Sequence, residues 1–161
     1  MLAALVEHWR RSTGGKDLPS RADLDLAALG PLLGHIFLID VSPTPFRFSV
    51  REIGAKIHET FGRCYAGYNI DDPEAAYFEP DNVADYMCAV NNMRPHFTCG
   101  QARSNSGSQI NYMRLLLPLS SDGVAVDMIL GGVVTSMAAA PSGSDDQFLE
   151  NAAEHLVAIA S

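Results

Sequence analysis

Residues 18–41 read LPSRADLDLAALGPLLGHIFLIDV, and this stretch contains the change of pattern that decides the fold. Ser20 and Asp23 have the spacing of a helix capping pair, so a short helix is expected to begin there. Gly30-Pro31 should end or kink that helix, because proline cannot continue the backbone hydrogen bonds. The chain then enters an apolar segment over residues 35–41 that is typical of a strand.

Further elements follow on both sides of this stretch. Strands are expected over residues 46–51, 96–103, 110–120 and 124–135, and helices over residues 2–11, around Ile57 and Phe61, from Pro80-Asp81 onward, and over residues 144–160. Ser121-Asp122-Gly123 is typical of a hairpin turn between the last two strands. Two strands before a helical insertion and three after it predict an α+β fold, with one antiparallel sheet covered on one face by the insertion.

The first helix has an apolar stripe that needs a partner surface. Leu2, Leu5, Val6 and Trp9 fall on one side of it, at spacings of three and four residues. A helix this short does not stand alone in water, so it must pack on its own domain or on another chain.

Length and charge limit the class of protein. The 161 residues fit one domain, which we divide into an N-terminal helix (1–14), a core (18–137) and a C-terminal helix (144–160). The net charge of −8 opposes general binding to nucleic acid or anionic membranes. No apolar run reaches the length of a membrane span, the N-terminus does not resemble a secretory signal, and three widely spaced cysteines suit reduced thiols. We therefore expect a cytoplasmic protein.

Three blocks of the sequence resemble a known family. LPSRADLDLAALGPLLGHIFLIDV (18–41), RFSVREIGAKIHETFGRCYAG (47–67) and RLLLPLSSDGVAVDMILGG (114–132) resemble the signature blocks of a bacterial PAS subfamily, mostly small stand-alone proteins of alphaproteobacterial type. The resemblance covers about residues 9–134. It departs at Gly54-Ala55-Lys56, where the family usually has glycine, threonine and arginine, so a hydroxyl that could cap the next helix is missing.

The resemblance implies a five-stranded antiparallel sheet with a cavity between its concave face and the central helices. Domains of this family bind small ligands or cofactors and transmit their occupancy through dimer contacts. PAS domains often dimerise through an N-terminal helix, so the resemblance places Leu2, Leu5, Val6 and Trp9 at a homodimer interface.

Two cofactors known from PAS domains have candidate residues here. Flavin-binding light sensors carry a reactive cysteine near the position of Cys64, but the surrounding FGRCYAG differs from their motif, and a structural thiol is the preferred interpretation. Haem needs an axial histidine, for which His58 and His96 are the candidates. A solvated or hydrogen-bonded histidine is the preferred interpretation of both, so the cofactor stays unassigned.

The sequence contains no motif typical of a metal site or a catalytic site. The histidines and cysteines do not cluster at ligand spacing, and Asp71-Asp72 with Glu74 lacks the pattern of a calcium loop. The sequence contains no nucleophile elbow, phosphate-binding loop or kinase signature. We expect neither a metal site nor an enzyme.

An apolar set of side chains is the best candidate for a ligand site. Methionine fills irregular spaces and a tyrosine hydroxyl can orient a ligand. The candidate residues are Ile57, Phe61, Tyr65, Tyr86, Met87, Met113, Leu115 and Met128. The alternative is that they form a filled core. Arg51 and Arg114 are expected on the opposite face of the sheet.

The sequence thus predicts a regulatory module that binds a small apolar or amphipathic molecule, or a signalling-protein partner, and acts through its dimer. The alternative is a ligand-free interaction adaptor that controls a kinase, a motility circuit or a cell-cycle circuit.

Overall fold

A computed structural model describes residues 1–62, 65–70 and 82–137, and these residues form an α+β fold around a five-stranded antiparallel sheet. The strands are β1 (Ile36–Pro43), β2 (Phe46–Ile53), β3 (His96–Arg103), β4 (Gln109–Leu119) and β5 (Met128–Met137). Their order across the sheet is β2-β1-β5-β4-β3. The predicted fold class is confirmed, while the predicted C-terminal helix over residues 144–160 lies outside the described residues.

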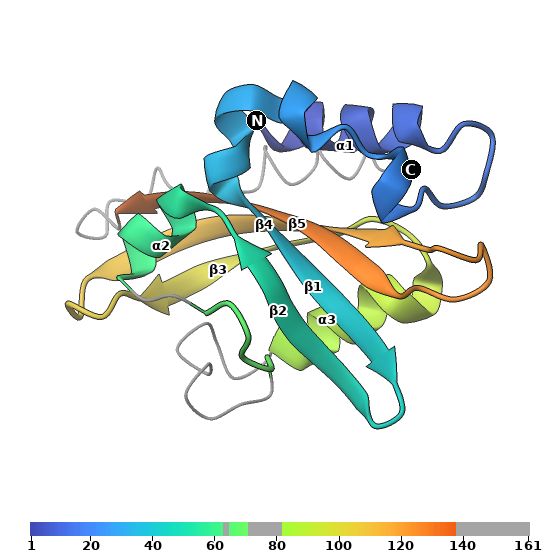
Figure 1. The fold of residues 1–161 in the computed structure, drawn as a ribbon. Helices are drawn as coiled ribbons and strands as arrows, with labels where there is room; N and C mark the ends of the chain where they lie inside the picture. Colours follow the sequence, from blue (N-terminus) through green and yellow to red (C-terminus); the bar gives the residue numbers. More distant parts are fainter. Residues whose placement is uncertain (63–64, 71–81, 138–161) are drawn as a thin grey trace.

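Helices lie on both faces of this sheet (Figure 1). They are α1 (Leu2–Ser12), α2 (Ala55–Phe61) and α3 (Asn82–Asn92), with two 3-10 segments, η1 (Arg21–Asp23) and η2 (Leu26–His35). Helix α1 contacts β4 and β5 on one face, whereas α3 contacts β3 and β4 on the other. The predicted order of a hairpin, a helical insertion and three further strands is therefore confirmed.

Helix α1 packs on the sheet of its own chain. Its predicted stripe, Leu2, Leu5, Val6 and Trp9, is at most 6% exposed. The indole nitrogen of Trp9 donates a hydrogen bond of 2.9 Å to the carbonyl of Pro118 in β4. This corrects the expected dimer interface, because the apolar stripe that was to contact a second chain is already buried against β4 and β5.

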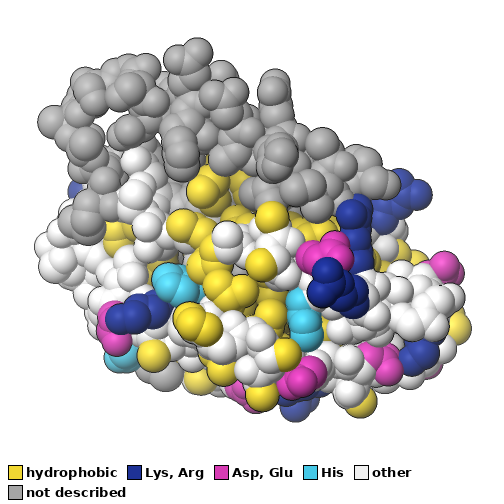
Figure 2. All heavy atoms as spheres, turned by 90° about the horizontal axis from the view of Figure 1, so that it is seen from above, with side chains coloured by type: hydrophobic (Ala, Val, Ile, Leu, Met, Phe, Trp, Pro, Cys, Tyr) yellow, Lys and Arg dark blue, Asp and Glu magenta, His cyan; other side chains and the backbone are white. Residues whose placement is uncertain are grey.

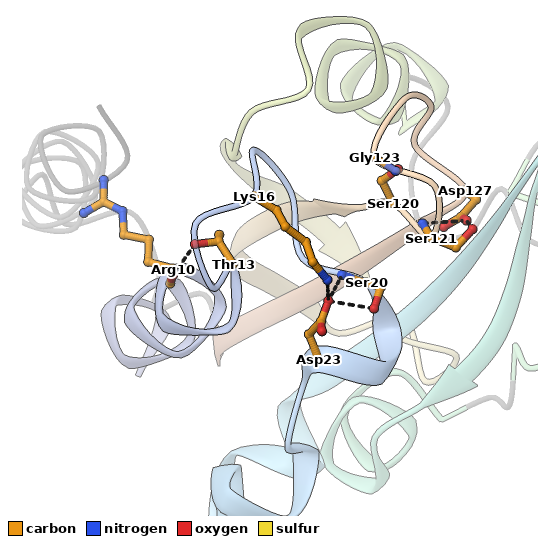
Figure 3. A network of polar contacts seen from close by, with 9 residues as sticks. All are labelled: Arg10, Thr13, Lys16, Ser20, Asp23, Ser120, Ser121, Gly123 and Asp127. Atoms are coloured by element: carbon orange, nitrogen blue, oxygen red, sulfur yellow. Dashed lines mark hydrogen bonds and ion pairs between the residues drawn. The ribbon is translucent and has the colours of Figure 1, made fainter.

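The lead-in to β1 is held by the predicted capping pair (Figure 3). Asp23 Oδ2 accepts hydrogen bonds from Ser20 N at 2.8 Å and Ser20 Oγ at 2.7 Å, and it lies 2.8 Å from Lys16 Nζ. The segment then continues as 3-10 turns rather than as the expected helix. Gly30, with φ of 50°, breaks the helical path one residue before Pro31.

The turn between β4 and β5 is longer than expected, so β5 begins at Met128 rather than at residue 124. Asp122 Oδ1 accepts hydrogen bonds from Val124 N at 2.8 Å and Ala125 N at 3.0 Å. These two amides are therefore used by the turn, as in other aspartate turns. Asp127 closes the loop by accepting from Ser121 N at 2.9 Å (Figure 3).

Two adjacent glycines in β5 let neighbours approach both faces of the sheet. A Cβ atom on Gly131 would lie 2.0 Å from Phe37 Cζ, so the phenyl ring of its partner residue in β1 lies directly over the glycine. A Cβ on Gly132 would lie 2.5 Å from Leu5 Cδ2 of α1. Because successive side chains of a strand point to opposite faces, Gly132 marks the α1 face and Gly131 marks the other face.

Candidate functional site

The candidate site lies on the face of the sheet opposite α1, where α3 packs. Arg114 of β4 pairs with Val133 of β5, one residue beyond Gly132, so it lies on this face. Arg114 Nη2 lies 2.5 Å from Asp85 Oδ2 of α3, and its side chain is only 3% exposed. A buried guanidinium is stable only with a nearby negative charge, which Asp85 supplies.

The same carboxylate also holds a histidine. Asp85 Oδ1 lies 3.2 Å from His96 Nε2, and His96 is the first residue of β3. The side chains of Asp85 and His96 are 28% and 26% exposed, so the cluster runs from the partly buried His96 to the fully buried Arg114. Asp85, His96 and Arg114 therefore join α3 to both strands beneath it; we call them the ionic cluster.

Aromatic rings surround the buried end of the ionic cluster. The guanidinium carbon of Arg114 lies 5.3 Å from the centroid of the Tyr86 ring and 5.7 Å from that of Tyr112, distances suited to cation–π attraction. Tyr86 also packs on Phe48 of β2, with centroids 5.4 Å apart. Burial raises the pKa of the Tyr86 phenol above its ordinary value, while the positive charge of Arg114 opposes part of this rise.

Of the predicted ligand-binding residues, Ile57, Phe61, Tyr65 and Tyr86 are buried in the core, with exposures of 4% or less. Met87 of α3 is partly buried against that core. Tyr86 packs on the site face, next to the ionic cluster. Whether any of these side chains contacts a ligand stays a prediction.

The other three predicted residues point away from α3. Leu115 pairs with Gly132, Met113 pairs with Val134, and Met128 pairs with Leu119, so all three lie on the α1 face. The expectation that they face the central helices is therefore wrong, and so is the placement of Arg114 on the opposite face. Arg51 does lie on the α1 face, as expected, and bonds Asp40 at 2.8 Å.

The ionic cluster was missed as a unit in the sequence. Residues 112–117 of β4 are apolar except for Arg114. The alternation of apolar and polar residues is therefore lost, and the sequence does not show which of these side chains point to which face of the sheet. A usable signal was the presence of an arginine inside a strand that is apolar on both sides. Such a charge requires an acid nearby, and Asp85 lies on the helix that precedes the strand pair.

The cofactor candidates are placed as follows. His58 is exposed on α2, whereas its neighbour Ile57 is buried, so His58 does not point into the core. His96 bonds Asp85. Cys64, Asp71, Asp72 and Glu74 lie outside the described residues. In the part of the chain that the structure describes, no three acids, histidines or cysteines are grouped as metal ligands. Among these residues, no helix is long and apolar enough to cross a bilayer.

Solved structures with the same fold include light–oxygen–voltage (LOV) domains. A LOV domain studied with a flavin analogue matches with a TM-score of 0.55 and 15% identity, covering 81% of this chain and 94% of its own. The LOV protein of Rhodobacter sphaeroides matches with a TM-score of 0.55 and 16% identity, covering 80% and 71%. The dark structure of Aureochrome1 LOV matches with a TM-score of 0.53 and 16% identity, covering 80% and 91%. At these identities the likeness concerns the fold alone.

The sequence itself gives the family. No curated protein matches it as a relative. A family model described as "PAS domain" matches residues 1–134, which include α1, the capped lead-in and nearly all of the sheet. This agrees with the five-stranded antiparallel sheet and the helical insertion after its second strand. The chain therefore belongs to the PAS domain family.

Proposed function

We propose that this chain is a non-enzymatic sensory or regulatory module that binds a small amphipathic molecule between the sheet and the central helices. The observation that carries the proposal is the ionic cluster beside buried apolar and aromatic side chains on the face under α3. Phe48 and Tyr86 offer apolar surface, and the Asp85–Arg114 pair offers polar atoms that a polar group can recognise. Pockets that bind small molecules combine these two kinds of lining.

The ionic cluster also suggests how occupancy changes the protein. Asp85 of α3 bonds both His96 and Arg114, so a ligand that rearranges this carboxylate alters the packing of α3 on β3 and β4. A ligand shifts a conformational equilibrium only through such a difference in interaction between two states. We propose that movement of α3 is the output, read by a partner chain or a second copy.

Dimerisation and a cytoplasmic location remain part of the proposal. Because the apolar stripe of α1 is buried in its own chain, a dimer would use another surface. Hydrophobic side chains gather near the centre of the face seen in Figure 2, and exposed apolar surface of this kind is often used for association.

A second candidate function is the ligand-free adaptor, and the packing near Gly131 favours it. Phe37 occupies the space over Gly131, and Tyr86 packs against Phe48, so part of the site face is filled by the protein's own rings. An adaptor of this kind would present its outer surface to a signalling protein while the core stays closed.

Native mass spectrometry of the purified full chain tests the two functions. A stoichiometric adduct that disappears on denaturation supports ligand binding, and its mass identifies the molecule. The Asp85→Asn variant should lose this adduct or bind it more weakly, while Glu59→Gln, an exposed acid on α2, should keep it. A chain without an adduct that also fails to bind any member of an amphipathic compound library would overturn the sensory proposal and favour the adaptor.

A further inference from the structure

A half-open hollow of about 590 Å³ lies where α3 ends and the chain turns into β3. It is lined by Cys88, Asn91, Asn92, Arg94, Pro95 and His96. The turn is made at Met93, whose φ of 53° reverses the chain just after the helix. The hollow therefore lies at the outer end of the interface between α3 and β3, and the proposed ligand space between the sheet and the central helices is a separate place.

The chemistry of this lining differs from that of the chain as a whole. The sequence contains 19 acidic residues and 11 lysines and arginines. Among the described residues, however, the hollow is lined by one arginine, one histidine and two asparagines together with Cys88 and Pro95, and none of these is acidic. Arginine forms paired hydrogen bonds with carboxylate and phosphate groups, and asparagine amides and histidine rings add further donors.

One feature of the hollow favours the opposite charge. The last carbonyl groups of α3 carry the partial negative charge of a helix C-terminus, which attracts cations. This contribution is a fraction of that from one hydrogen bond between charged groups, and it acts only within the last turn. Arg94 lies two residues beyond the helix end and offsets this charge. From these observations we propose that the hollow is a binding site for a small hydrophilic molecule that carries a carboxylate or phosphate group.

His96 connects this site to the interior. It lines the hollow and also bonds Asp85, which holds the buried Arg114. An anion that binds Arg94 and His96 attracts the imidazole in competition with the carboxylate of Asp85. Binding of an anion in the hollow thereby changes how α3 packs on the sheet. This second input does not depend on a ligand between the sheet and the central helices.

The test uses the full chain labelled with ¹⁵N, titrated separately with malonate and inorganic phosphate at constant ionic strength. Saturable shifts are expected in the backbone amides of residues 88–94 and of His96. Arg94→Gln and His96→Gln should each weaken binding roughly tenfold or more, because each removes a charge-assisted hydrogen bond. Arg103→Gln, at the other end of the same strand, is the matched control and should bind as the wild type does.

The comparison of the two probes identifies the group, since a carboxylate site prefers malonate and a phosphate site prefers phosphate. The absence of saturable shifts in residues 88–94 and His96 with both probes would overturn the proposal, and so would equal binding by the wild type and Arg94→Gln. The result is separate from the mass-spectrometry test of the core ligand: an adduct there with no effect of anions here would leave the first function standing and remove this one.

Discussion

Asp85 of α3 and Arg114 of β4 form an ion pair across the helix–sheet interface, with Asp85 Oδ2 2.5 Å from Arg114 Nη2. The pair differs from the other ion pairs of the described residues in its depth, since the Arg114 side chain is 3% exposed and the Lys56 and Glu59 side chains are 58% and 59% exposed. The first prediction follows from this difference in depth.

Replacing Asp85 with alanine should lower the free energy of unfolding by about 2–4 kcal/mol, because a buried guanidinium loses its carboxylate. This loss is smaller than is usual for fully buried ion pairs because the Asp85 side chain is 28% exposed. Urea denaturation of the purified chain measures the loss.

Glu59→Ala is the control for this prediction. It removes one member of an exposed pair on α2 and should change the free energy of unfolding far less than Asp85→Ala does. If both variants lose the same stability, the Asp85–Arg114 pair has no special role in holding α3.

Much of the fold could be predicted because its signals are local. The spacing of Ser20 and Asp23 marked the capping pair, and the alternation of Phe48 and Val50 with polar neighbours marked β2. The orientation of β4 could not be predicted in the same way. Its centre is buried on both faces, so alternation between apolar and polar residues is lost, and Leu115 and Arg114 were assigned to the wrong faces.

The surface on which α1 packs could not be predicted from the sequence either. An apolar stripe shows that a helix is buried, but it does not show whether its own sheet or a second chain covers it. The deciding contact is Leu5 over Gly132, which joins residues 127 positions apart, and no local pattern contains such a pairing.

Replacing Gly131 with alanine should destabilise the chain by about 1–3 kcal/mol, the usual cost of overpacking. The new Cβ would lie 2.0 Å from Phe37 Cζ and 2.1 Å from Cε2, and the Phe37 side chain is buried in the core. Thermal denaturation of the wild type and the variant measures the effect.

Two further variants separate crowding from other causes. Gly132→Ala meets the flexible end of Leu5 at 2.5 Å and should cost less than Gly131→Ala. Adding Phe37→Leu to Gly131→Ala should restore part of the lost stability relative to the sum of the single changes. Additive losses would show that Phe37 is not what excludes a side chain at Gly131.

Replacing Leu5 with alanine should lower the free energy of unfolding by about 2–5 kcal/mol, because the side chain is 2% exposed and its loss leaves a cavity between α1 and the sheet. The free energy lost should not depend on protein concentration, since the contact is made within one chain. Urea denaturation at two protein concentrations that differ by roughly 50-fold checks this point. A loss of stability seen only at the higher protein concentration would instead show that the apolar stripe of α1 lies in a dimer interface.

The last prediction concerns pH and the capped lead-in. The hydrogen bond from Lys16, followed by that from the Ser20 amide, lowers the pKa of Asp23 well below its ordinary value of 3.8. A carboxylate whose pKa is lower in the folded than in the unfolded chain stabilises the fold above the unfolded value, and this contribution is lost as the pH falls toward the folded value. Wild type should therefore be more stable than Asp23→Asn at pH 6, and the difference should shrink steadily below about pH 4. Urea denaturation of both proteins from pH 6 to pH 2.5 measures this difference in stability, and the comparison cancels the titration of the other acids.

Asp17→Asn is the control, because it removes a charge from the same segment but leaves the contacts of Asp23 in place. The difference in stability between Asp17→Asn and wild type should therefore not shrink in this way as the pH falls. Parallel curves for wild type and Asp23→Asn would mean that the capping pair contributes nothing through its charge.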